Sequence, residues 1–509
     1  MSNLTKFEKI VNLCKRRGFV FPSAEIYGGF AGFYDYGPLG IEMKKNIIDS
    51  WWNRFVRQRE DVVGIDGCTI NHRMIWKASG HVDSFTDLLV ECKSCNSRYR
   101  ADHLIEDTIK ITTDGITIEQ ANEIIKKYKI RCPKCKNELN SVKTFNLMFK
   151  TFVGLIEDEA HIAYLRPETA QLIFTNFKLV MESSRLKLPF GIAQVGRVYR
   201  NEISPRDFLF RTREFEQMEI EYFVHPDKIN ECPYLNEEIL DFKMNVYSSE
   251  MQEKKEKWKK MSIGELINKN IIKTKWHAYW LAQMYAWFLD FGINSEKLRI
   301  RQHLPEERSH YALDTWDIEY FFPFGWKEIH GMANRTTYDL EQHIKFSGKD
   351  LRYFDEEQNK KIIPYVVAEP SQGVDRIFLT LLIDAYYEDE IKGEKRIVLK
   401  LHPKIAPYNI AIFPLVNKDG LPEKAKEVYS LVKKQFTCFY DDRGSIGRRY
   451  RRMDEIGIPF CITIDHQTLR DNTITIRDRD TLKQIRVKIS NLLNTLNKLI
   501  NLYGNLDSI

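Results

Sequence analysis

The segment from Gly196 to Tyr222, GRVYRNEISPRDFLFRTREFEQMEIEY, constrains this chain more than any other. It has the form of an apolar strand, a charged loop and a second strand with alternating glutamates. Two strands joined by a basic loop place arginines and carboxylates in one cleft, where a guanidinium suits phosphate and a carboxylate can accept from an amino group. A salt-bridged surface hairpin is the commoner fate of mixed charge. Arg200-x-Glu202, a short loop and Arg211-x-x-x-Phe215 form too detailed an arrangement to favour it.

Composition restricts the class of protein. The 509 residues are enough for two or three domains, and 43% apolar with 29% charged residues is typical of a globular chain. No apolar run approaches the roughly 20 residues of a membrane span, and the N-terminal segment, which carries Glu8, does not read as a signal peptide. We therefore expect a cytoplasmic protein without membrane contacts. A net charge of +6 permits local basic patches but does not by itself predict nucleic-acid binding.

The order of apolar and polar residues predicts the elements. We expect a helix over 6–16, a glycine-rich turn over 28–40, and a long helix over 41–59 whose buried face includes Ile47, Trp51 and Phe55. Residues 226–310 read as helix-rich. In that part, the charged run 251–261 is interpreted as a solvated helix face, with a tRNA phosphate contact as the minor alternative, and the aromatic run 276–292 as core.

The C-terminal part has a different character. Residues 374–389 are expected to form the last helix of the first part, and Pro403 and Pro407 mark a boundary near 401–407. Beyond it, apolar strands and amphipathic helices alternate, which is the signature of a small α/β domain. Its segment 444–457 carries several arginines, and they indicate either an RNA-binding patch or an ordinary basic helix face.

Four of the nine cysteines form two pairs, Cys92-x-x-Cys95 and Cys132-x-x-Cys135. Two such turns close a tetrahedral Cys₄ site, so we predict a structural zinc in a module spanning 91–140. The gap between the pairs is long for a zinc ribbon, and a helix over 118–130 accounts for it. Four unrelated thiols or a redox pair are the alternatives, and the paired spacing favours zinc over both.

The charged segment described first resembles motif 2 of the class II aminoacyl-tRNA synthetases. The chain as a whole resembles the homodimeric glycyl-tRNA synthetases, most specifically at AYLRPETAQLIFTNFK (163–178), at 190–223 and at YVVAEPSQGVDRIFLTLL (365–382). The resemblance implies an α+β fold with three parts. An antiparallel sheet flanked by helices would form a catalytic domain over 1–400, with insertions at 91–140 and about 226–310. Residues 401–509 would form an α/β anticodon-binding domain.

The resemblance also implies an ATP site. Arg200 would clamp the α-phosphate, Glu202 would accept from the adenine amino group, and Phe215 would stack on adenine. Arg376 would hold the other side of the base or the γ-phosphate, and Glu328 would bind Mg²⁺. Of these, Arg200, Glu202 and Arg376 are the expected catalytic residues. The remaining expected ATP contacts are Asn201, Phe210, Arg211 (on the β/γ-phosphates), Thr212, Arg213, Glu214, Ile329, Gly373, Val374 and Asp375.

Glycine has no side chain to read, so its pocket must recognise the ammonium and carboxylate groups and exclude anything larger. Glu168, Glu219, Glu369 and Ser371 would hold the ammonium group, and Arg335 or Arg100 the carboxylate. The other expected contacts are Phe215, Glu216 (a less certain member), Gln217, Met218, Pro370, Gln372 and Gly373. No nucleophile or general base is expected, because attack on the α-phosphate depends mainly on positioning and charge stabilisation.

Two departures from the class II pattern stand out. The stretch GCTINHRMIW (67–76) has no proline where motif 1 usually carries one, so the expected homodimer depends on whole-chain resemblance. Gln372 stands in motif 3 where small residues are usual, and it is expected to leave less room beside the ligand.

Three rival interpretations remain. A non-catalytic synthetase-like protein need not keep the ATP residues, which this chain retains together. A threonyl or prolyl enzyme would share the C-terminal domain, but RPETAQ, FEQME and EPS together favour glycine. A zinc-ribbon nucleic-acid-binding protein explains residues 92–135 alone. The expected partners are ATP, glycine, tRNA for glycine and a second copy of the chain.

Overall fold

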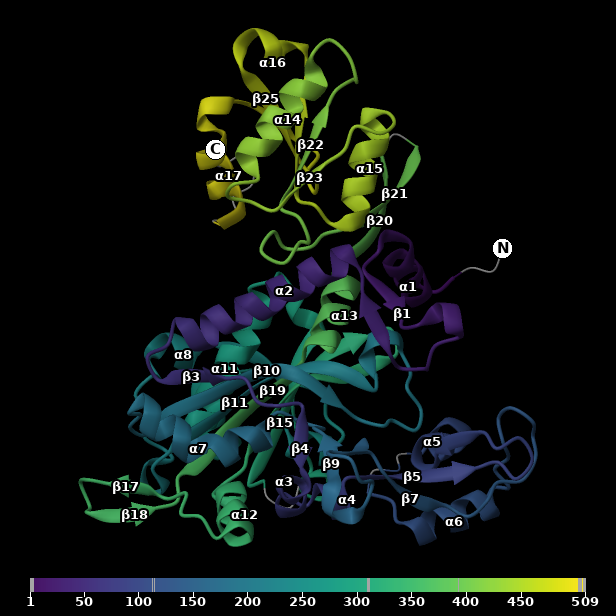
Figure 1. Ribbon diagram of the computed structural model, residues 1–509, viewed down its shortest axis with the longest axis vertical. Helices are drawn as coiled ribbons and strands as arrows, with labels where there is room; N and C mark the ends of the chain where they lie inside the picture. The colour runs from purple at the N-terminus through teal and green to yellow at the C-terminus, as the bar shows by residue number, and fades with distance from the viewer. Residues whose placement is uncertain are drawn as a thin grey trace.

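The computed structural model describes residues 4–111, 113, 115–308, 312–391, 393–501 and 506. A nine-stranded sheet forms the centre of the larger part of the molecule (Figure 1). Most neighbouring strands are antiparallel, as predicted, and two outer pairs are parallel. The strand order is β13 (Lys259–Ser262), β12 (Lys243–Tyr247), β14 (Leu298–Gln302), β15 (Asp314–Phe322), β16 (Gly325–Asn334), β19 (Tyr365–Gly373), β11 (Glu214–Val224), β10 (Phe190–Tyr199) and β3 (Val62–Ile65).

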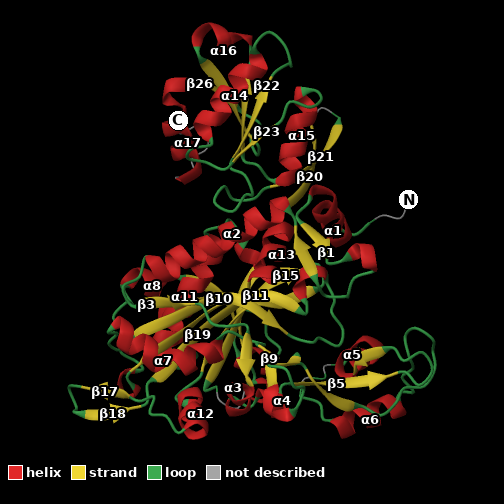
Figure 2. Ribbon diagram, in the orientation of Figure 1, coloured by secondary structure: helices red, strands yellow, loops and turns green. Residues whose placement is uncertain are grey.

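Helices cover both faces of this sheet (Figure 2). Helices α2 (Pro38–Trp52), α11 (Lys275–Leu289) and α13 (Val374–Ala385) share one large apolar core, in which Trp51 and Phe378 are fully buried. Helices α7 (Ala170–Ser184) and α12 (Tyr338–Ser347) pack in a second core on Phe223 of β11. The sheet is therefore a rigid middle layer, which suits a site built at the ends of its strands.

The register of the central strands aligns the residues that matter below. Strands β10 and β11 pair continuously from Phe190 with Phe223 to Tyr199 with Glu214, which confirms the predicted strand, loop and strand. Glu219 of β11 lies opposite Ser371 of β19, and Ser371 lies opposite Gly331 of β16. Because alternate residues of a strand face the same side, these three positions share one face of the sheet.

The N-terminal elements follow the expectation with one adjustment. Helix α1 covers Lys6–Arg17 and is capped by Thr5, whose side chain accepts from the Glu8 amide. The predicted helix over 41–59 begins earlier, at Pro38. It ends as an α-helix at Trp52 and continues as one π-helical turn, Asn53–Arg57. The predicted buried face is confirmed.

Of the two interpretations of the middle of the chain, one was wrong and one is confirmed. The charged run 251–261 is not a helix face, because α9 (Ser249–Glu253) ends early and the run finishes in edge strand β13. There Lys259 and Lys260 are exposed while Met261 is buried, and lysines are typical of a sheet edge that must avoid further pairing. The aromatic run is confirmed as core, since α11 is buried nearly all round.

The segment 374–389 is a helix up to Ala385. Tyr386–Ile391 instead form β20, which pairs antiparallel with β21 (Glu394–Leu399). Exposed and less exposed residues alternate in β20 from Glu388 to Ile391, which is the period of a strand and not of a helix.

The cysteine module projects from the sheet at the lower right of Figure 1. It contains β5 (Thr86–Glu91), β6 (Arg98–Arg100) and β7 (Lys143–Asn146) with helices α5 (Ala101–Ile109) and α6 (Ile118–Lys127). Helix α6 confirms the predicted insertion between the cysteine pairs. The apolar core of this module is small, and its buried members are Val90, Ala101, Leu104, Ile105, Ala121, Ile130 and Val142.

The C-terminal segment forms a five-stranded sheet at the top of Figure 1. Strands β23 (Cys438–Tyr440), β22 (Ile410–Pro414) and β24 (Phe460–Ile464) are parallel, and β25 (Thr473–Asp478) and β26 (Gln484–Lys488) complete it antiparallel. Its helices are α14 (Leu421–Val432), α15 (Ile446–Ile456), α16 (His466–Asp471) and α17 (Leu492–Asn501). The alternation of strand and helix is as predicted.

Candidate active site

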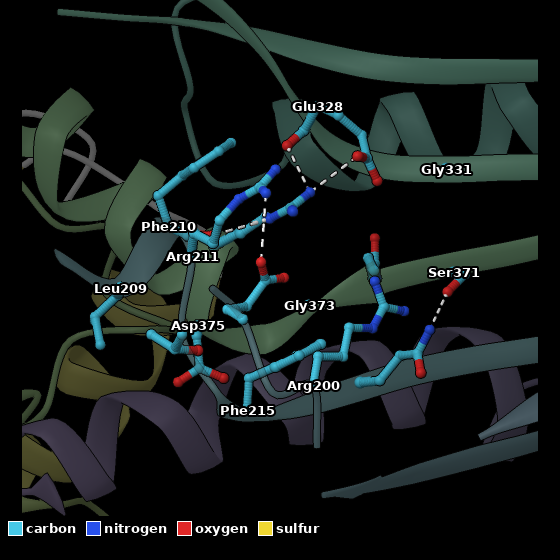
Figure 3. A pocket seen from close by; sticks show the side chains of 15 residues that line it. Arg200, Leu209, Phe210, Arg211, Phe215, Glu328, Gly331, Ser371, Gly373 and Asp375 are labelled. Atoms are coloured by element: carbon cyan, nitrogen blue, oxygen red, sulfur yellow. Dashed lines mark hydrogen bonds and ion pairs between the residues drawn. The ribbon is translucent and has the colours of Figure 1, made fainter. Parts of the chain in front are cut away.

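A cleft of about 680 Å³ opens between the loop that joins β10 to β11, the inner strands β16 and β19, and the start of α13 (Figure 3). Its lining brings together residues that lie far apart in the sequence. The lining residues are Arg200, Glu202, Leu209, Phe210, Arg211, Thr212, Phe215, Gln217, Glu328, Gly331, Ser371, Gln372, Gly373, Asp375 and Arg376. Ten of these are expected ATP contacts, so the cleft gathers most of that predicted set.

Arg200 follows the end of β10 and projects into the cleft from the side opposite Glu328 (Figure 3). Its Nε donates to the carbonyl of Pro167 at 3.0 Å. The guanidinium lies 5.4 Å from the ring centre of Phe215 and 5.5 Å from that of Phe85. Two aromatic faces and a carbonyl therefore fix a cation whose hydrogen-bonding edge remains available for an anion.

Each of two other arginines is paired with a carboxylate of the cleft. Arg376, in the first turn of α13, lies 3.0 Å from a carboxylate oxygen of Glu328 and 4.7 Å from the ring centre of Phe210. Arg211 lies 3.4 Å from Glu202. Both cations therefore project over the cleft next to acidic groups, an arrangement that can hold the phosphates of a nucleotide together with its metal ion.

A buried polar group adjoins the cleft. The amide nitrogen of Gln217 donates to Ser371 Oγ at 2.6 Å and to Glu219 at 3.0 Å, and the Thr169 hydroxyl also donates to Glu219. Burial, and then the neighbouring Glu168 carboxylate, raise the pKa of Glu219 to about 7. A carboxylate that titrates near neutrality beside a hydroxyl and an amide suits recognition of a small ammonium group.

More carboxylates lie behind this group. Arg335 donates to Glu369 at 2.7 Å and to both oxygens of Asp339 at 2.7 and 2.8 Å, and all three residues are buried. Burial raises the pKa of Glu369 well above its usual value, against the pull of Arg335. Glu221, 0% exposed, also has its pKa raised by burial, and then by Glu369. A cation in the adjoining space would favour the ionised forms of these carboxyl groups, so the cluster suits a site for a positively charged group.

Glu168 belongs to the same group through different partners. Gln171 bridges it to Asp339, with distances of 3.0 and 2.9 Å, and the Nε2 of His81 lies 3.3 Å from its carboxylate. Burial alone would raise the pKa of Glu168, but His81 holds it below its usual value. Glu168 is therefore ionised beside Glu219, which is one reason that Glu219 is hard to ionise.

Several expected contacts lie elsewhere. Met218, Ile329, Val374 and Pro370 have buried side chains that do not line the cleft. Asn201, Arg213 and Glu214 are likewise outside the lining, and Glu214 pairs with Arg197 at 2.5 Å. Strand alternation explains Met218, Ile329 and Pro370, since every second residue of a strand must face away from the cleft, whereas Val374 is the first residue of helix α13.

Arg100 and Glu216 are also set apart from the cleft. Arg100 pairs with Asp87 at 2.7 Å and Asp102 at 2.5 Å in the cysteine module. Glu216 pairs with Lys44 and lines a neighbouring cavity.

Gln372 lines the cleft, but its side chain is directed away from it and does not crowd the ligand space in the expected way. Its side-chain oxygen lies 3.0 Å from Nδ1 of His330, and both residues are buried. Because Ser371 contacts Gln217 on the cleft side, the adjacent Gln372 side chain lies on the opposite side of β19.

Other residues beside the site carry no signal in the sequence. Asp317 of β15 is buried, lies 2.8 Å from His303, and has its pKa raised to about 6 by burial. Its carboxylate lies close to Gly331, as does that of Glu328. His81 contacts Glu168, and Phe85 contacts Arg200. No motif or periodicity marks these positions, because only strand pairing and chain folding bring them to the site.

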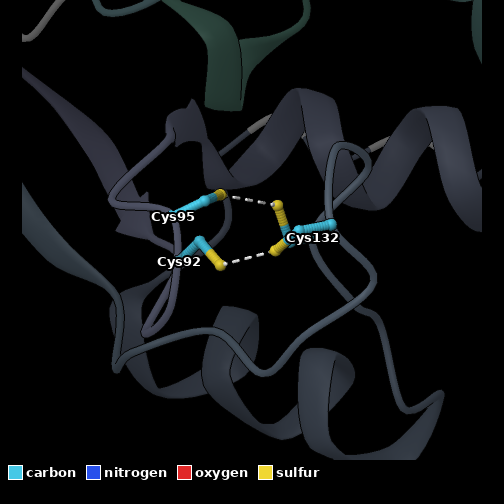
Figure 4. A group of neighbouring side chains, drawn as sticks. Cys92, Cys95 and Cys132 are labelled. Carbon is cyan, nitrogen blue, oxygen red and sulfur yellow. Dashed lines mark hydrogen bonds between the residues drawn. The ribbon is translucent and has the colours of Figure 1, made fainter.

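The four predicted cysteine ligands converge (Figure 4). Their sulfur atoms all lie within 4.8 Å of one another, with Cys92 to Cys135 at 3.4 Å and Cys95 to Cys132 at 3.6 Å. Thiolates about 2.3 Å from a tetrahedral zinc would be about 3.8 Å apart, so the donor set and spacing fit such an ion. The cluster could bind a metal.

Comparisons with known proteins agree with this geometry. The family model for the tRNA synthetase class II core domain (G, H, P, S and T) matches residues 149–386, and the model for the anticodon binding domain matches residues 409–499. The sheet and its cleft are thus those of a class II aminoacyl-tRNA synthetase.

Similar proteins show which class II synthetase family the chain belongs to. A glycine–tRNA ligase of Caldanaerobacter subterraneus subsp. tengcongensis is 50% identical over 488 residues, covering 95% of this chain and 96% of that protein. Glycine–tRNA ligases of Clostridium tetani and Geobacillus thermodenitrificans are each 46% identical, covering 96% and 97% of this chain and 98% and 97% of their own. The chain belongs to the glycine–tRNA ligase family. Among its described residues, no helix has the length and apolarity needed to cross a membrane.

Proposed function

We propose that this protein ligates glycine to its cognate tRNA, first forming glycyl-adenylate from ATP with release of pyrophosphate and then transferring glycine to the tRNA 3′ end. One observation carries the proposal. The cleft that holds Arg200, Arg211 and Arg376 adjoins the buried carboxylate of Glu219 and the hydroxyl of Ser371. Phosphate-binding cations and an ammonium-binding group therefore meet, as the joining of ATP to an amino acid requires.

In the first step, Arg200 stabilises the charge that grows on the α-phosphate as the glycine carboxylate attacks. Phe215 supports one face of adenine and Arg376 the other, while Glu202 accepts from the adenine amino group. Arg211 approaches the β- and γ-phosphates. No side chain needs to act as a nucleophile, because attack and departure both occur between substrates. Asp375 contributes to the lining of this site, and the remaining proposed ATP-site residues, Asn201, Arg213, Glu214, Ile329 and Val374, support it from outside the cleft.

Magnesium accompanies ATP in class II synthetases. The carboxylate of Glu328 stands on the cleft wall next to Arg376, and hard oxygen donors of this kind suit Mg²⁺. When bound, the ion would neutralise charge on the phosphates. Glu328 would hold it, and Arg376 would orient Glu328.

For glycine, Glu219, Glu168 and Ser371 receive the ammonium group. Gln217 orients Ser371 and Glu219 together, because one amide donates to both. Glu369 and Arg335 close the back of the pocket through their mutual ion pair, so Arg335 acts on glycine chiefly by holding these carboxylates. A wall of bonded polar groups leaves no space for the methyl of alanine, and rejection is therefore steric.

Amino-acid-dependent ATP–pyrophosphate exchange tests the proposal. Exchange is expected with glycine alone among the standard amino acids, and Arg200→Ala is expected to abolish it. Exchange with threonine or proline would show that the amino acid is not glycine, while the assignment to class II synthetases would stand. Absence of exchange from folded, metal-loaded protein would favour a non-catalytic relative and overturn the proposal.

Zinc is proposed for the Cys₄ cluster. Its four sulfurs leave no open position for catalysis, so the ion would be structural. It would hold together a module whose apolar core is small.

The remaining organisation is proposed on the same basis. Residues 1–400 would form the catalytic domain, with the insertions given above, and 401–509 the anticodon-binding domain. Strand β3 supports a homodimer because it lies at one edge of the nine-stranded sheet. Within the described residues it pairs only with β10, and an edge strand of this kind can pair with a second chain. A cytoplasmic location fits a tRNA substrate. Light scattering during size-exclusion chromatography tests the dimer.

A further inference from the structure

One segment without any recognised motif contacts two charged residues of the proposed site, Glu168 and Arg200, and a third, Arg100, in the cysteine module. This segment, residues 79–87, is called the strap below. It leads from α3 (Arg73–Ala78) through α4 (His81–Ser84) into the first strand of the cysteine module, β5. His81, Phe85 and Asp87 make the three contacts.

The first contact holds a carboxylate of the glycine pocket. Nε2 of His81 lies 3.3 Å from Glu168, and the other ring nitrogen lies 2.8 Å from the Ser79 hydroxyl. The His81 ring also packs on the rings of Trp76 and Phe85, with centroid separations of 5.3 and 5.2 Å. With both nitrogens bonded and two aromatic rings against it, His81 has little freedom, and so it fixes the position of Glu168.

The second contact holds the arginine proposed to bind the α-phosphate. The guanidinium of Arg200 lies 5.5 Å from the ring centre of Phe85 and 5.4 Å from that of Phe215. Cation–π attraction at both rings restrains the orientation of Arg200 without using its N–H groups. An aliphatic side chain at position 85 would fill space but would not supply this attraction.

The strap is itself tied to the residue after Arg200. The side-chain amide of Asn146 donates to the backbone carbonyls of His81 and Val82 at 3.1 and 2.9 Å. The Leu147 amide donates to the carbonyl of Phe85 at 3.0 Å, and the Asn201 amide donates to the carbonyl of Leu147 at 2.6 Å. A continuous run of backbone bonds therefore connects the strap to the loop that carries Arg200.

The third contact extends the connection into the module. Asp87 lies 2.7 Å from Arg100, the residue immediately before helix α5. Burial raises the pKa of Asp87 to about 6, in spite of Arg100.

We propose that the strap is a positioning element for glycine activation, in which His81 sets Glu168 for the ammonium group and Phe85 sets Arg200 for the α-phosphate. This inference rests on the proposed function. His81 and Phe85 act through other residues and are positioning residues. His81 acts on a contact to glycine and Phe85 on a contact to ATP, so substitutions at the two positions should change different kinetic constants.

Glycine-dependent ATP–pyrophosphate exchange with full-length protein tests this, with active sites counted by the burst of adenylate formation. His81→Leu should raise the KM for glycine about tenfold and leave the KM for ATP unchanged. Phe85→Leu should lower kcat about tenfold, and Phe85→Tyr, which retains the ring, should restore it. His81→Asn replaces His81→Leu if the latter does not fold. Asp83→Asn, an exposed position in the strap, is the matched control and should behave as wild type.

Unchanged KM for glycine in folded His81 variants, or equal loss of kcat in Phe85→Leu and Phe85→Tyr, would overturn the role of the strap while the proposed function stands. Loss of active sites at unchanged kinetic constants would do the same, because it would indicate a purely structural role. Absence of glycine-dependent exchange in the wild-type protein would overturn the proposed function itself, and the strap inference with it.

Discussion

The Tyr36 hydroxyl donates a 2.6 Å hydrogen bond to the carboxylate of Asp375. The other oxygen of Asp375 accepts from the backbone amide of Glu216 at 2.9 Å. The pairing of β11 with β19 reaches its last residue pair at Gln217 and Gly373. Asp375 extends the connection from β11 into the first turn of α13, because it bonds the residue before Gln217 and lies two residues after Gly373. Phe215 and Arg376, which are proposed to enclose adenine, are the neighbours of the two bonded residues, so Asp375 would set the width of the proposed adenine slot.

We expect Tyr36→Phe to weaken ATP binding. The change keeps the ring and removes one hydrogen bond to a carboxylate, which is worth roughly 1.5–3 kcal/mol. The KM for ATP in pyrophosphate exchange should rise about tenfold or more, and the KM for glycine should not change. Tyr34→Phe, on the same strand, is the control, because the Tyr34 ring packs edge-on against Phe208. An unchanged KM for ATP would show that Asp375 does not control the slot.

Arg335→Met should lower the stability of the fold strongly, although methionine is similar in size to arginine. It would leave the carboxylates of Glu369 and Asp339 buried without their cation, a loss of about 3–5 kcal/mol. Thermal unfolding should show a midpoint several degrees below wild type. Arg352→Met breaks an exposed pair with Asp350 and should cost under about 1 kcal/mol. Equal midpoints for the two variants would contradict the buried network.

Glycine activation should increase as the pH rises through about 7. Burial raises the pKa of Glu219 to about 7, and the ionised carboxylate is the form that attracts ammonium. We expect kcat/KM for glycine to follow this ionisation between pH 5.5 and 8.5. Glu219→Gln should abolish glycine activation. The exposed Glu182→Gln should retain the wild-type profile. A flat wild-type profile would exclude Glu219 as the titrating contact.

The same ionisation has a cost for folding. The pKa of Glu219 is higher in the folded protein than in an unfolded chain, so its stabilising effect is complete below about pH 4.5 and is lost as the pH rises from there through about 7. The loss amounts to about 3 kcal/mol at pH values above that range. Because Glu219→Gln cannot ionise, its unfolding midpoint should rise relative to that of the wild type as the pH increases from 5 to 8. A constant difference between the two would contradict the raised pKa.

Removing the metal should loosen the cysteine module selectively. The module has a small core, so much of its stability must come from the ligands. Cys132→Ser, or treatment with a chelator, should make residues 91–140 susceptible to limited proteolysis. It should also remove about one zinc ion per chain, as measured by inductively coupled plasma mass spectrometry. Cys68→Ser, an exposed cysteine outside the cluster, should retain the metal. Full metal content in Cys132→Ser would refute the site.

The sequence alone determined the elements whose signal is local. The apolar spacing of 41–59 and the aromatic run of 276–292 fixed buried helices, because a helix repeats its face every 3.6 residues. The strand, loop and strand of 196–222 and the two Cys-x-x-Cys turns were equally clear, since their partners lie close along the chain. Short charged stretches were misread where packing decided the outcome, as in edge strand β13 and in hairpin β20–β21.

Only the tertiary structure decided how the site is assembled. Register places Glu219, Ser371 and Gly331 side by side from three strands, and alternation turns Gln372 and Met218 away from the cleft. The roles of His81 with Glu168 and of Tyr36 with Asp375 depend on contacts across 87 and 339 residues of chain. Such contacts leave no periodic trace in the sequence, because a hydrogen bond or stacked ring constrains one position and not a pattern. The sequence therefore determines which chemistry is present, and the folded sheet determines which groups meet to perform it.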